Sequence, residues 1–244
     1  MIRRLLHPIS VEVRQRDMPM KQTARVLLAL AMAATVPVAM QAHFKLVEPA
    51  SWIAEDQRGD PQKLAPCGGL LPAPANAPAA AAPAANAPQM TKTNTVTKVT
   101  GGSKIHLKVE ETIFHPGHYR VALAVNSREE LPADPMTFER TTERGPQSVW
   151  AVIQSPPQLP VIADGLFQHY TRPAQTTPPQ PLIWETDIQL PNINCAKCTM
   201  QVIQFMAQHG YNQPGGYSYH HCADLQITAD PSKPVEKGWP TTTH

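Results

Sequence analysis

Several features that would point to common classes of protein are scarce or missing in this sequence. Only 16% of its 244 residues are charged and 6% are aromatic. It contains neither the G-x-S-x-G pattern of a nucleophile elbow nor the H-E-x-x-H pattern of zinc hydrolases, so it supports neither kind of enzyme. The main apolar stretch, residues 26–40, is too short to cross a bilayer with margin and has no stop-transfer flank.

The same apolar stretch has the features of a secretory signal. It follows the basic segment MKQTAR and precedes the small residue Ala42. We therefore predict a signal peptide over residues 1–42, whose n-region is extended unless the chain starts at Met18 or Met20. Cleavage after Ala42 makes His43 the mature N-terminus of a secreted or periplasmic protein, although a cut one or two residues away stays open.

Removing this leader changes the charge balance of the chain. The leader carries six of the 21 Lys and Arg but only two of the 19 Asp and Glu, so the mature part is close to neutral. A near-neutral chain gives no electrostatic reason to expect nucleic acid or an anionic membrane as a partner. We expect a single-domain monomer over residues 43–244, with no membrane contact after processing.

All four cysteines, Cys67, Cys195, Cys198 and Cys222, lie in the mature part. An even number behind a signal peptide indicates two structural disulfides, with three possible connectivities. Cys195 and Cys198 form a C-x-x-C that could also serve redox chemistry or zinc. The sequence has no second C-x-x-C and no βαβ pattern around this one, so we favour structural disulfides.

The mature sequence reads as β-structure. Ile105, Leu107 and Val109 alternate with polar residues, which is typical of a half-buried strand. Further strands are expected at 118–125, 148–154, 181–190, 198–207 and 222–229, although residues 195–210 could also be read as a helix. Long loops, one with a helical turn, are expected at 126–149 and 154–181. A low-complexity Ala/Pro segment at about 72–90 is expected to be a disordered insertion. The prediction is an all-β, immunoglobulin- or fibronectin-like antiparallel sandwich with long loops.

Nine histidines remain after the leader, and three places among them stand out. His106, His169 and His244 are expected on the surface, in a loop and at the terminus. The three places that stand out are His43, the pair His115 and His118, and the pair His220 and His221, and at most one residue of the last pair should face a site.

An N-terminal histidine has a particular chemistry. Its α-amine and ring Nδ1 can chelate one metal ion together, and an imidazole from elsewhere would add a third nitrogen. A nitrogen-rich, tetragonal set of this kind suits Cu(II).

Several short motifs resemble the lytic polysaccharide monooxygenases and the bacterial secreted proteins similar to them. They are HFKLVEPASW at the mature start, PCGG at 66–69, HPGHYRVALA at 115–124, CTMQVIQFMAQHG at 198–210 and YSYHHCADLQI at 217–227. The matches run through most of the mature chain and leave the Ala/Pro segment out.

The resemblance implies one copper ion in a histidine brace. His43 would give its amine and Nδ1, His115 its Nε2, and Tyr219 would lie axially, so these three residues would form the catalytic centre. His118, Gln204, His209 and Asp224 would be nearby contacts or, for His118, an alternative ligand. Copper reduced by an external electron donor would use O2 or peroxide to oxidise glycosidic C–H bonds of a chitin- or cellulose-like polysaccharide.

Two other classes of protein remain open. A copper-binding or copper-delivery protein would need the same His43 and His115 but no open substrate face. A metal-free sandwich that binds glycans or surfaces would be indifferent to the loss of His43.

Overall fold

The computed structural model describes residues 43–69, 90–174, 177, 180–212 and 215–239. The described chain contains ten strands and one short 3₁₀ turn. The strands are β1 (His43–Glu48), β2 (Val96–Thr100), β3 (Lys104–Ile113), β4 (Gly117–Ala124), β5 (Thr137–Thr142), β6 (Gly145–Ala151), β7 (Val161–His169), β8 (Leu182–Gln189), β9 (Cys195–Met206) and β10 (Ser218–Thr228), and the turn is η2 (Arg128–Glu130).

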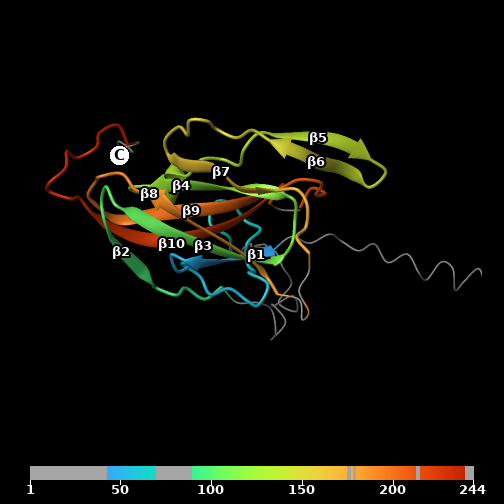
Figure 1. Ribbon diagram of the computed structural model, residues 1–244, viewed down its shortest axis with the longest axis horizontal. Coiled ribbons are helices and arrows are strands. Elements are labelled where there is room, and N and C mark those ends of the chain that lie inside the picture. Colours follow the sequence, from blue (N-terminus) through green and yellow to red (C-terminus); the bar gives the residue numbers. More distant parts are fainter. Residues whose placement is uncertain (1–42, 70–89, 175–176, 178–179, 213–214, 240–244) are drawn as a thin grey trace, which may run out of the picture. The chain divides into compact units, whose positions relative to one another are not determined.

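Two sheets carry most of these strands. One has the order β1-β3-β8, and the other has the order β2-β10-β9-β4-β7. The pairings are antiparallel except at the edge, where β2 runs parallel to β10. Strands β5 and β6 form a separate hairpin, which extends away from the two sheets in Figure 1.

The inner faces of the two sheets share one apolar core. Along β3 the side chains alternate as predicted, with Ile105, Leu107 and Val109 buried and their neighbours more exposed. The core joins these residues to side chains of the other sheet, including Tyr119, Val121, Leu123, Met200, Val202, Tyr219 and Leu225. The predicted all-β sandwich is therefore confirmed, while its immunoglobulin type stays a prediction.

The predicted strand around Ile105, Leu107 and Val109 corresponds to β3. The strands predicted at 118–125, 148–154, 181–190, 198–207 and 222–229 correspond to β4, β6, β8, β9 and β10, and β6 ends at Ala151. Residues 195–206 form a strand, so the helical reading of that segment is wrong. The expectation of loops at 126–149 and 154–181 is also wrong in part. The first range holds β5 and the start of β6, the second holds all of β7, and the expected helical turn is η2.

Both disulfides of the described chain are formed. Cys67 is bonded to Cys222 and Cys195 to Cys198, which selects one of the three connectivities. The first bond joins the segment after β1 to the middle of β10 across 155 residues of sequence. It thereby fastens the 49–69 segment to the larger sheet.

Two predictions fall outside the described residues. They are the signal peptide over 1–42 and most of the Ala/Pro insertion at about 72–90. Within the described ranges, no helix has the length and apolar character needed to cross a membrane.

The packing of β3 leads to a test of the sandwich core. Replacing the fully buried Leu107 with Ala should lower the free energy of unfolding by about 2–5 kcal/mol, because it leaves a cavity between the sheets. Its neighbour His106 is exposed and contacts Asp187 at the surface, so His106→Ala should lower the free energy of unfolding far less than Leu107→Ala does. Chemical denaturation of both variants measures the two costs, and equal costs would contradict this packing.

Candidate metal centre

Four rings meet at one end of the sandwich. His43 opens β1, Tyr219 lies near the start of β10, His115 stands between β3 and β4, and His209 follows β9. The ring centroids are 5.4 Å apart for His43 and Tyr219, 6.4 Å for Tyr219 and His209, and 4.9 Å for His209 and His115. Residues spread over 177 positions of sequence therefore form one continuous cluster of rings.

Asp60 determines which nitrogen of the His43 ring carries the proton. The Nε2 atom of His43 lies 3.1 Å from Oδ2 of Asp60, an arrangement in which the ring donates and the carboxylate accepts. This hydrogen bond lowers the pKa of Asp60. With the proton on Nε2, Nδ1 carries a lone pair. That Nδ1 is buried and has no hydrogen-bond partner among the described residues.

The His115 ring has the complementary arrangement. Its Nδ1 lies 3.2 Å from the carbonyl oxygen of Pro116 and can only donate to it, so the lone pair is on Nε2. This Nε2 is also buried without a hydrogen-bond partner in the described part of the chain. Burial lowers the pKa of His115 to about 4, so the ring is neutral at physiological pH and its lone pair is available.

Gly117 allows β4 to start directly after His115. A Cβ atom at this position would collide with the backbone carbonyl of Phe205 on β9, so no other residue fits here without a shift. The Pro116–Gly117 turn therefore places His115 at the very end of the sheet, where the sequence analysis expects a ligand.

Tyr219 contributes a neutral phenol to the cluster. Burial, and after it the charge of Asp60, raises the pKa of Tyr219 to about 12. The ring presents an edge-on arrangement to His43, at an interplanar angle of 60°. A phenol that stays protonated can approach a cation as a weak, neutral ligand.

A buried carboxylate lies behind His115. Glu111 is 1% exposed and accepts hydrogen bonds from the His115 backbone N–H at 2.8 Å, Gln204 Nε2 at 2.8 Å and Trp184 Nε1 at 3.0 Å. Gln204, which the family resemblance suggests as a nearby contact, is therefore linked to His115 through Glu111.

His169 completes this network from β7. Its Nε2 donates to the His115 carbonyl at 2.7 Å and lies 3.3 Å from Glu111 Oε1, while Nδ1 faces the Phe167 carbonyl. Both ring nitrogens thus face acceptors, which requires the doubly protonated ring. Burial lowers the pKa of His169, but the hydrogen bond and charge of Glu111 outweigh it, so the net pKa is raised.

Side chains also hold the outer edge of β1. Gln62 accepts from the Phe44 N–H at 3.1 Å, and His221 Nε2 donates to the Phe44 carbonyl at 3.0 Å. Glu55 accepts from the Leu46 N–H at 3.1 Å. The strand that begins with His43 is therefore fastened on both edges, by β3 on one side and by these side chains on the other.

His221 and Glu55 form a buried pair beneath this strand. His221 Nδ1 lies 3.0 Å from Glu55 Oε1. Burial lowers the pKa of His221 to about 4 and raises the pKa of Glu55 to about 8. The neutral carboxyl can donate to Nδ1, which must accept because Nε2 already donates. His220, on the opposite face of β10, pairs with Asp134 at 2.7 Å instead.

Two residues suggested by the sequence lie outside the ring cluster. His118 projects from the face of β4 opposite to Tyr119, packs on Phe205 and lies 4.0 Å from Asp164. Asp224 stands about 16 Å along β10 from Tyr219 at the usual rise of a strand. His209, by contrast, lies inside the cluster.

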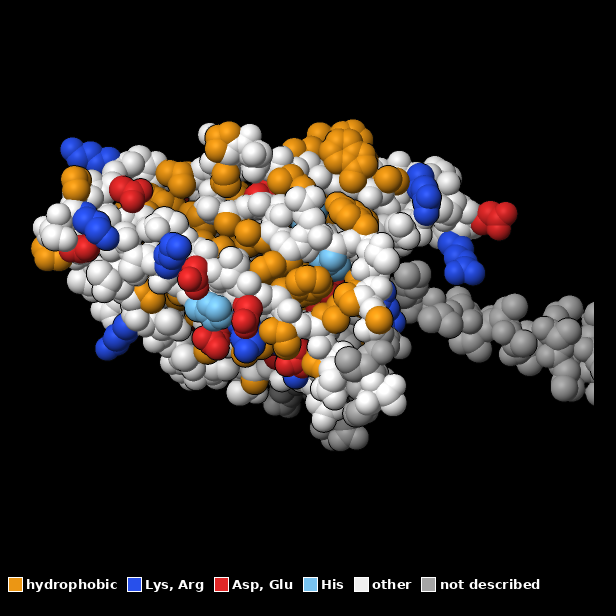
Figure 2. All heavy atoms as spheres, in the orientation of Figure 1, with side chains coloured by type: hydrophobic (Ala, Val, Ile, Leu, Met, Phe, Trp, Pro, Cys, Tyr) orange, Lys and Arg blue, Asp and Glu red, His pale blue; other side chains and the backbone are white. Residues whose placement is uncertain are grey.

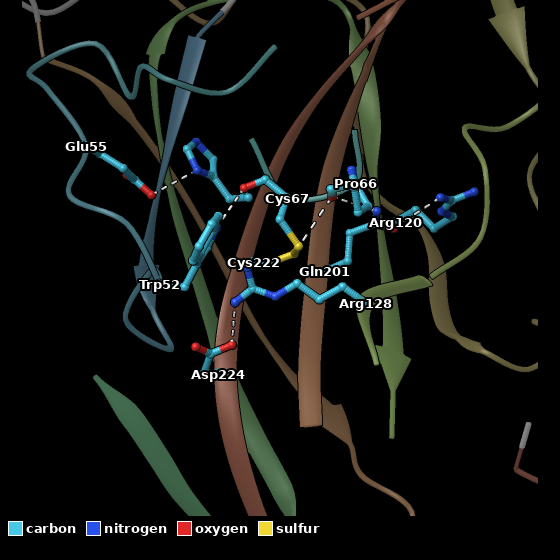
Figure 3. Close-up of a disulfide and its surroundings, with 10 residues drawn as sticks. Trp52, Glu55, Pro66, Cys67, Arg120, Arg128, Gln201, Cys222 and Asp224 are labelled. Carbon is cyan, nitrogen blue, oxygen red and sulfur yellow. Dashed lines mark hydrogen bonds and ion pairs between the residues drawn. A yellow bond between two sulfur atoms is a disulfide. The ribbon is translucent and has the colours of Figure 1, made fainter. Parts of the chain in front are cut away.

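Figure 3 shows the surroundings of Asp224, beside the Cys67–Cys222 disulfide. Arg128 bonds to Asp224 at 2.8 Å and lies over the Trp52 ring at 3.8 Å, and Trp52 Nε1 donates to the Cys67 carbonyl at 2.8 Å. Asp224 thus serves to hold this disulfide region together.

The donor set has the composition that a histidine brace requires. Within the described ranges, no group of three or more His, Cys, Asp and Glu side chains could hold a metal ion. A brace, however, would use only two side chains, and its third ligand would be the α-amine of a chain that begins at His43. The two ring nitrogens that it needs, Nδ1 of His43 and Nε2 of His115, are the two left without partners on these rings.

The chain matches no protein-family model, and no curated protein matches it either.

Several residues of the site were not anticipated from the sequence, namely Asp60, Glu111, His169, Glu55 and Gln62. For Glu111 a signal existed, because it continues the inward positions of Ile105, Leu107 and Val109, and a charge on an apolar face needs partners.

The contact between Asp60 and His43 should determine the tautomer of the His43 ring in the metal-free protein. We expect the His43 ring to hold its proton on Nε2, and Asp60→Ala to allow a mixture of the two neutral tautomers. Nitrogen-15 NMR of the ring reports the protonation of each nitrogen. Asp60→Asn keeps an acceptor oxygen and serves as the control, and unchanged ring signals in Asp60→Ala would refute the role of Asp60.

The Glu55–His221 pair should make stability depend on pH. The folded pair holds one proton from about pH 4 to about pH 8, whereas the unfolded chain releases it near 6.5, the ordinary pKa of histidine. Between pH 6.5 and 8 the folded state therefore binds more protons, and stability falls as pH rises, by about 2 kcal/mol.

Denaturation profiles of the wild-type protein and Glu55→Gln test this directly. The folded variant has no proton to release at this pair above pH 6.5. The difference between the two profiles therefore gives the contribution of the pair to the pH dependence of stability. Parallel profiles between pH 6.5 and 8 would show that the shared proton is absent.

Proposed function

We propose that this chain is a secreted mononuclear copper protein with an N-terminal histidine brace, and that it acts as a lytic polysaccharide monooxygenase-like enzyme. One observation carries the proposal. The two histidines suggested by the motifs each have one ring nitrogen bonded to a protein acceptor and the other buried without a partner. Metal-binding histidines commonly have this arrangement, because the outer hydrogen bond sets the tautomer of the ligand.

The residues of the cluster have distinct roles in this proposal. His43 offers Nδ1 and, after processing, its amine; His115 offers Nε2; and Tyr219 offers a neutral phenol beside His43. Asp60 and the Pro116 carbonyl hold the two ring protons away from these lone pairs. Copper bound here and reduced by an external electron donor would supply the activation of O2 or peroxide needed to oxidise a glycosidic C–H bond.

Exposed aromatic side chains close to the cluster support a polysaccharide as the partner. Phe138 and Trp150 stack at 3.8 Å on the β5–β6 hairpin and remain 41% and 47% exposed. Figure 2 shows hydrophobic side chains gathered near the base of this hairpin. Ser148 of the hairpin bonds to the backbone of His209, so the aromatic pair belongs to an element attached to the ring cluster.

Burial of the cluster favours a second candidate, a copper-binding or copper-delivery protein. In the full-length chain His43 is 2% exposed, His115 is fully buried and Tyr219 is 1% exposed. A carrier would use the same ligands and would have less need of an open substrate face. A glycan-oxidation assay on the copper-loaded protein separates the two candidates.

Electron paramagnetic resonance of the Cu(II) protein tests copper binding itself. The protein is produced with its own leader, intact mass establishes that it begins at His43, and one equivalent of Cu(II) is added. We expect a type 2 spectrum with nitrogen couplings that is lost or strongly altered in His115→Ala.

His118→Ala is the matched control, because His118 is equally buried but lies on the other face of β4. Its spectrum should equal that of the wild-type protein. A form that retains Ala42 lacks the free amine and should lose the spectrum as well. A signal of loosely bound copper that is the same in every variant would rule out both copper functions and leave a metal-free binding sandwich.

A further inference from the structure

The backbone of His115 is held from both sides by a pair of charged side chains. Its N–H donates to Glu111 Oε1 at 2.8 Å, and its carbonyl accepts from His169 Nε2 at 2.7 Å. The two side chains also contact each other, with 3.3 Å between His169 Nε2 and Glu111 Oε1. The peptide groups before and after His115 are thereby fixed, and with them the direction of its side chain.

Burying this pair of charges in the interior of a sandwich has a large cost in desolvation free energy. The side chain of Glu111 has no exposed surface and that of His169 is 4% exposed. Removing two charges from water costs several kcal/mol for each ion, and apolar residues of similar volume often give equal or better stability. Stability alone therefore does not account for an ion pair at this place.

The remaining contacts of the pair restrict its own movement. Trp184 of β8 donates to Glu111 and stacks on the His169 ring, with 4.8 Å between ring centroids. Gln204 of β9 donates to the same Glu111 oxygen that His115 uses. Strands β3, β7, β8 and β9 each supply a residue, so the pair is fixed by both sheets at once.

We propose that Glu111 and His169 act as positioning residues that hold the His115 imidazole with Nε2 directed toward the ring cluster. The proposal rests on the proposed function in one respect, because it takes His115 to be the second copper ligand. Neither residue would contact the metal. They act through the two peptide groups of His115. The Pro116 carbonyl adds to this effect, because it accepts from the ring and so keeps the ring proton on Nδ1.

The first test uses the metal-free protein. Nitrogen-15 and proton NMR of His115 should give one sharp set of ring signals and a slowly exchanging backbone amide in the wild-type protein. In Glu111→Gln one of the two oxygens becomes an amide donor, which must face either Trp184 or the donors of His115 and Gln204, so the network cannot re-form in full. We expect several or broadened His115 signals and faster amide exchange in this variant.

The second test measures Cu(II) affinity by competition with a chelator of known affinity. We expect Glu111→Gln and His169→Gln each to weaken binding by about 10- to 100-fold, the usual effect of losing an outer partner of a ligand. Their EPR spectra should be broadened but should retain nitrogen couplings, because both ligands are still present.

A matched control separates positioning from general loss of stability. Asn192 is a buried polar residue that holds the 230–236 segment through hydrogen bonds to Asp230, Lys233 and Pro234. Asn192→Ala should lower the melting temperature but leave both the His115 signals and the Cu(II) affinity unchanged. If Asn192→Ala weakens copper as much as Glu111→Gln does, the positioning role is refuted.

The two proposals fail in different ways. A wild-type protein without nitrogen-coupled copper would refute the proposed function, while the NMR of the metal-free protein would still decide whether Glu111 and His169 order His115. A copper-binding wild-type protein with unchanged His115 signals and affinity in the variants would refute the positioning pair alone. Should Glu111→Gln fail to fold, His169→Gln decides, since it leaves the carboxylate and its three other donors in place.

Discussion

A carboxylate buried between two sheets has to find its partners inside the protein, and Glu111 meets this requirement with groups from four different segments. Its donors come from His115, His169, Trp184 and Gln204. Moving His169 away would remove the counter-charge of Glu111, and moving any of the other three segments would remove one of its hydrogen bonds, and both changes penalise a buried carboxylate. These bonds constrain the end of the sandwich that carries the candidate site, and the placement of His115 follows from that constraint.

The sequence predicts which side chains of a strand face the core better than it predicts which distant residues they contact. Alternation along β3 correctly places Ile105, Leu107 and Val109 inside, and one further step along the same face arrives at Glu111. In β10 the same logic turns His220 away from the core and His221 toward it. The partners of Glu111 could not be found in this way, because strand periodicity gives no information on which distant strand lies opposite.

Strands β5 and β7, which lie in segments predicted to be loops, differ from the strands that the sequence predicts. In β5 and β7 most side chains are only partly covered, so neither strand shows the clear alternation that a buried face imposes. Strand β7 even carries two residues with a left-handed backbone, Gly165 at φ 63° and Phe167 at φ 50°. Their pairing depends on tertiary contacts, and a reading based on composition places such segments in loops. His169 was assigned to a loop for the same reason, although it closes β7 beside His115.

The outer edge of β1 has a consequence for association between molecules. An edge strand normally presents free amide and carbonyl groups on which a strand of another chain can pair, and this is a common origin of aggregation. Here the Phe44 amide, the Phe44 carbonyl and the Leu46 amide are already bonded to Gln62, His221 and Glu55. The contacts that orient the residues after His43 therefore also deny these backbone groups to an incoming strand, which lowers the tendency of this edge to pair with another molecule.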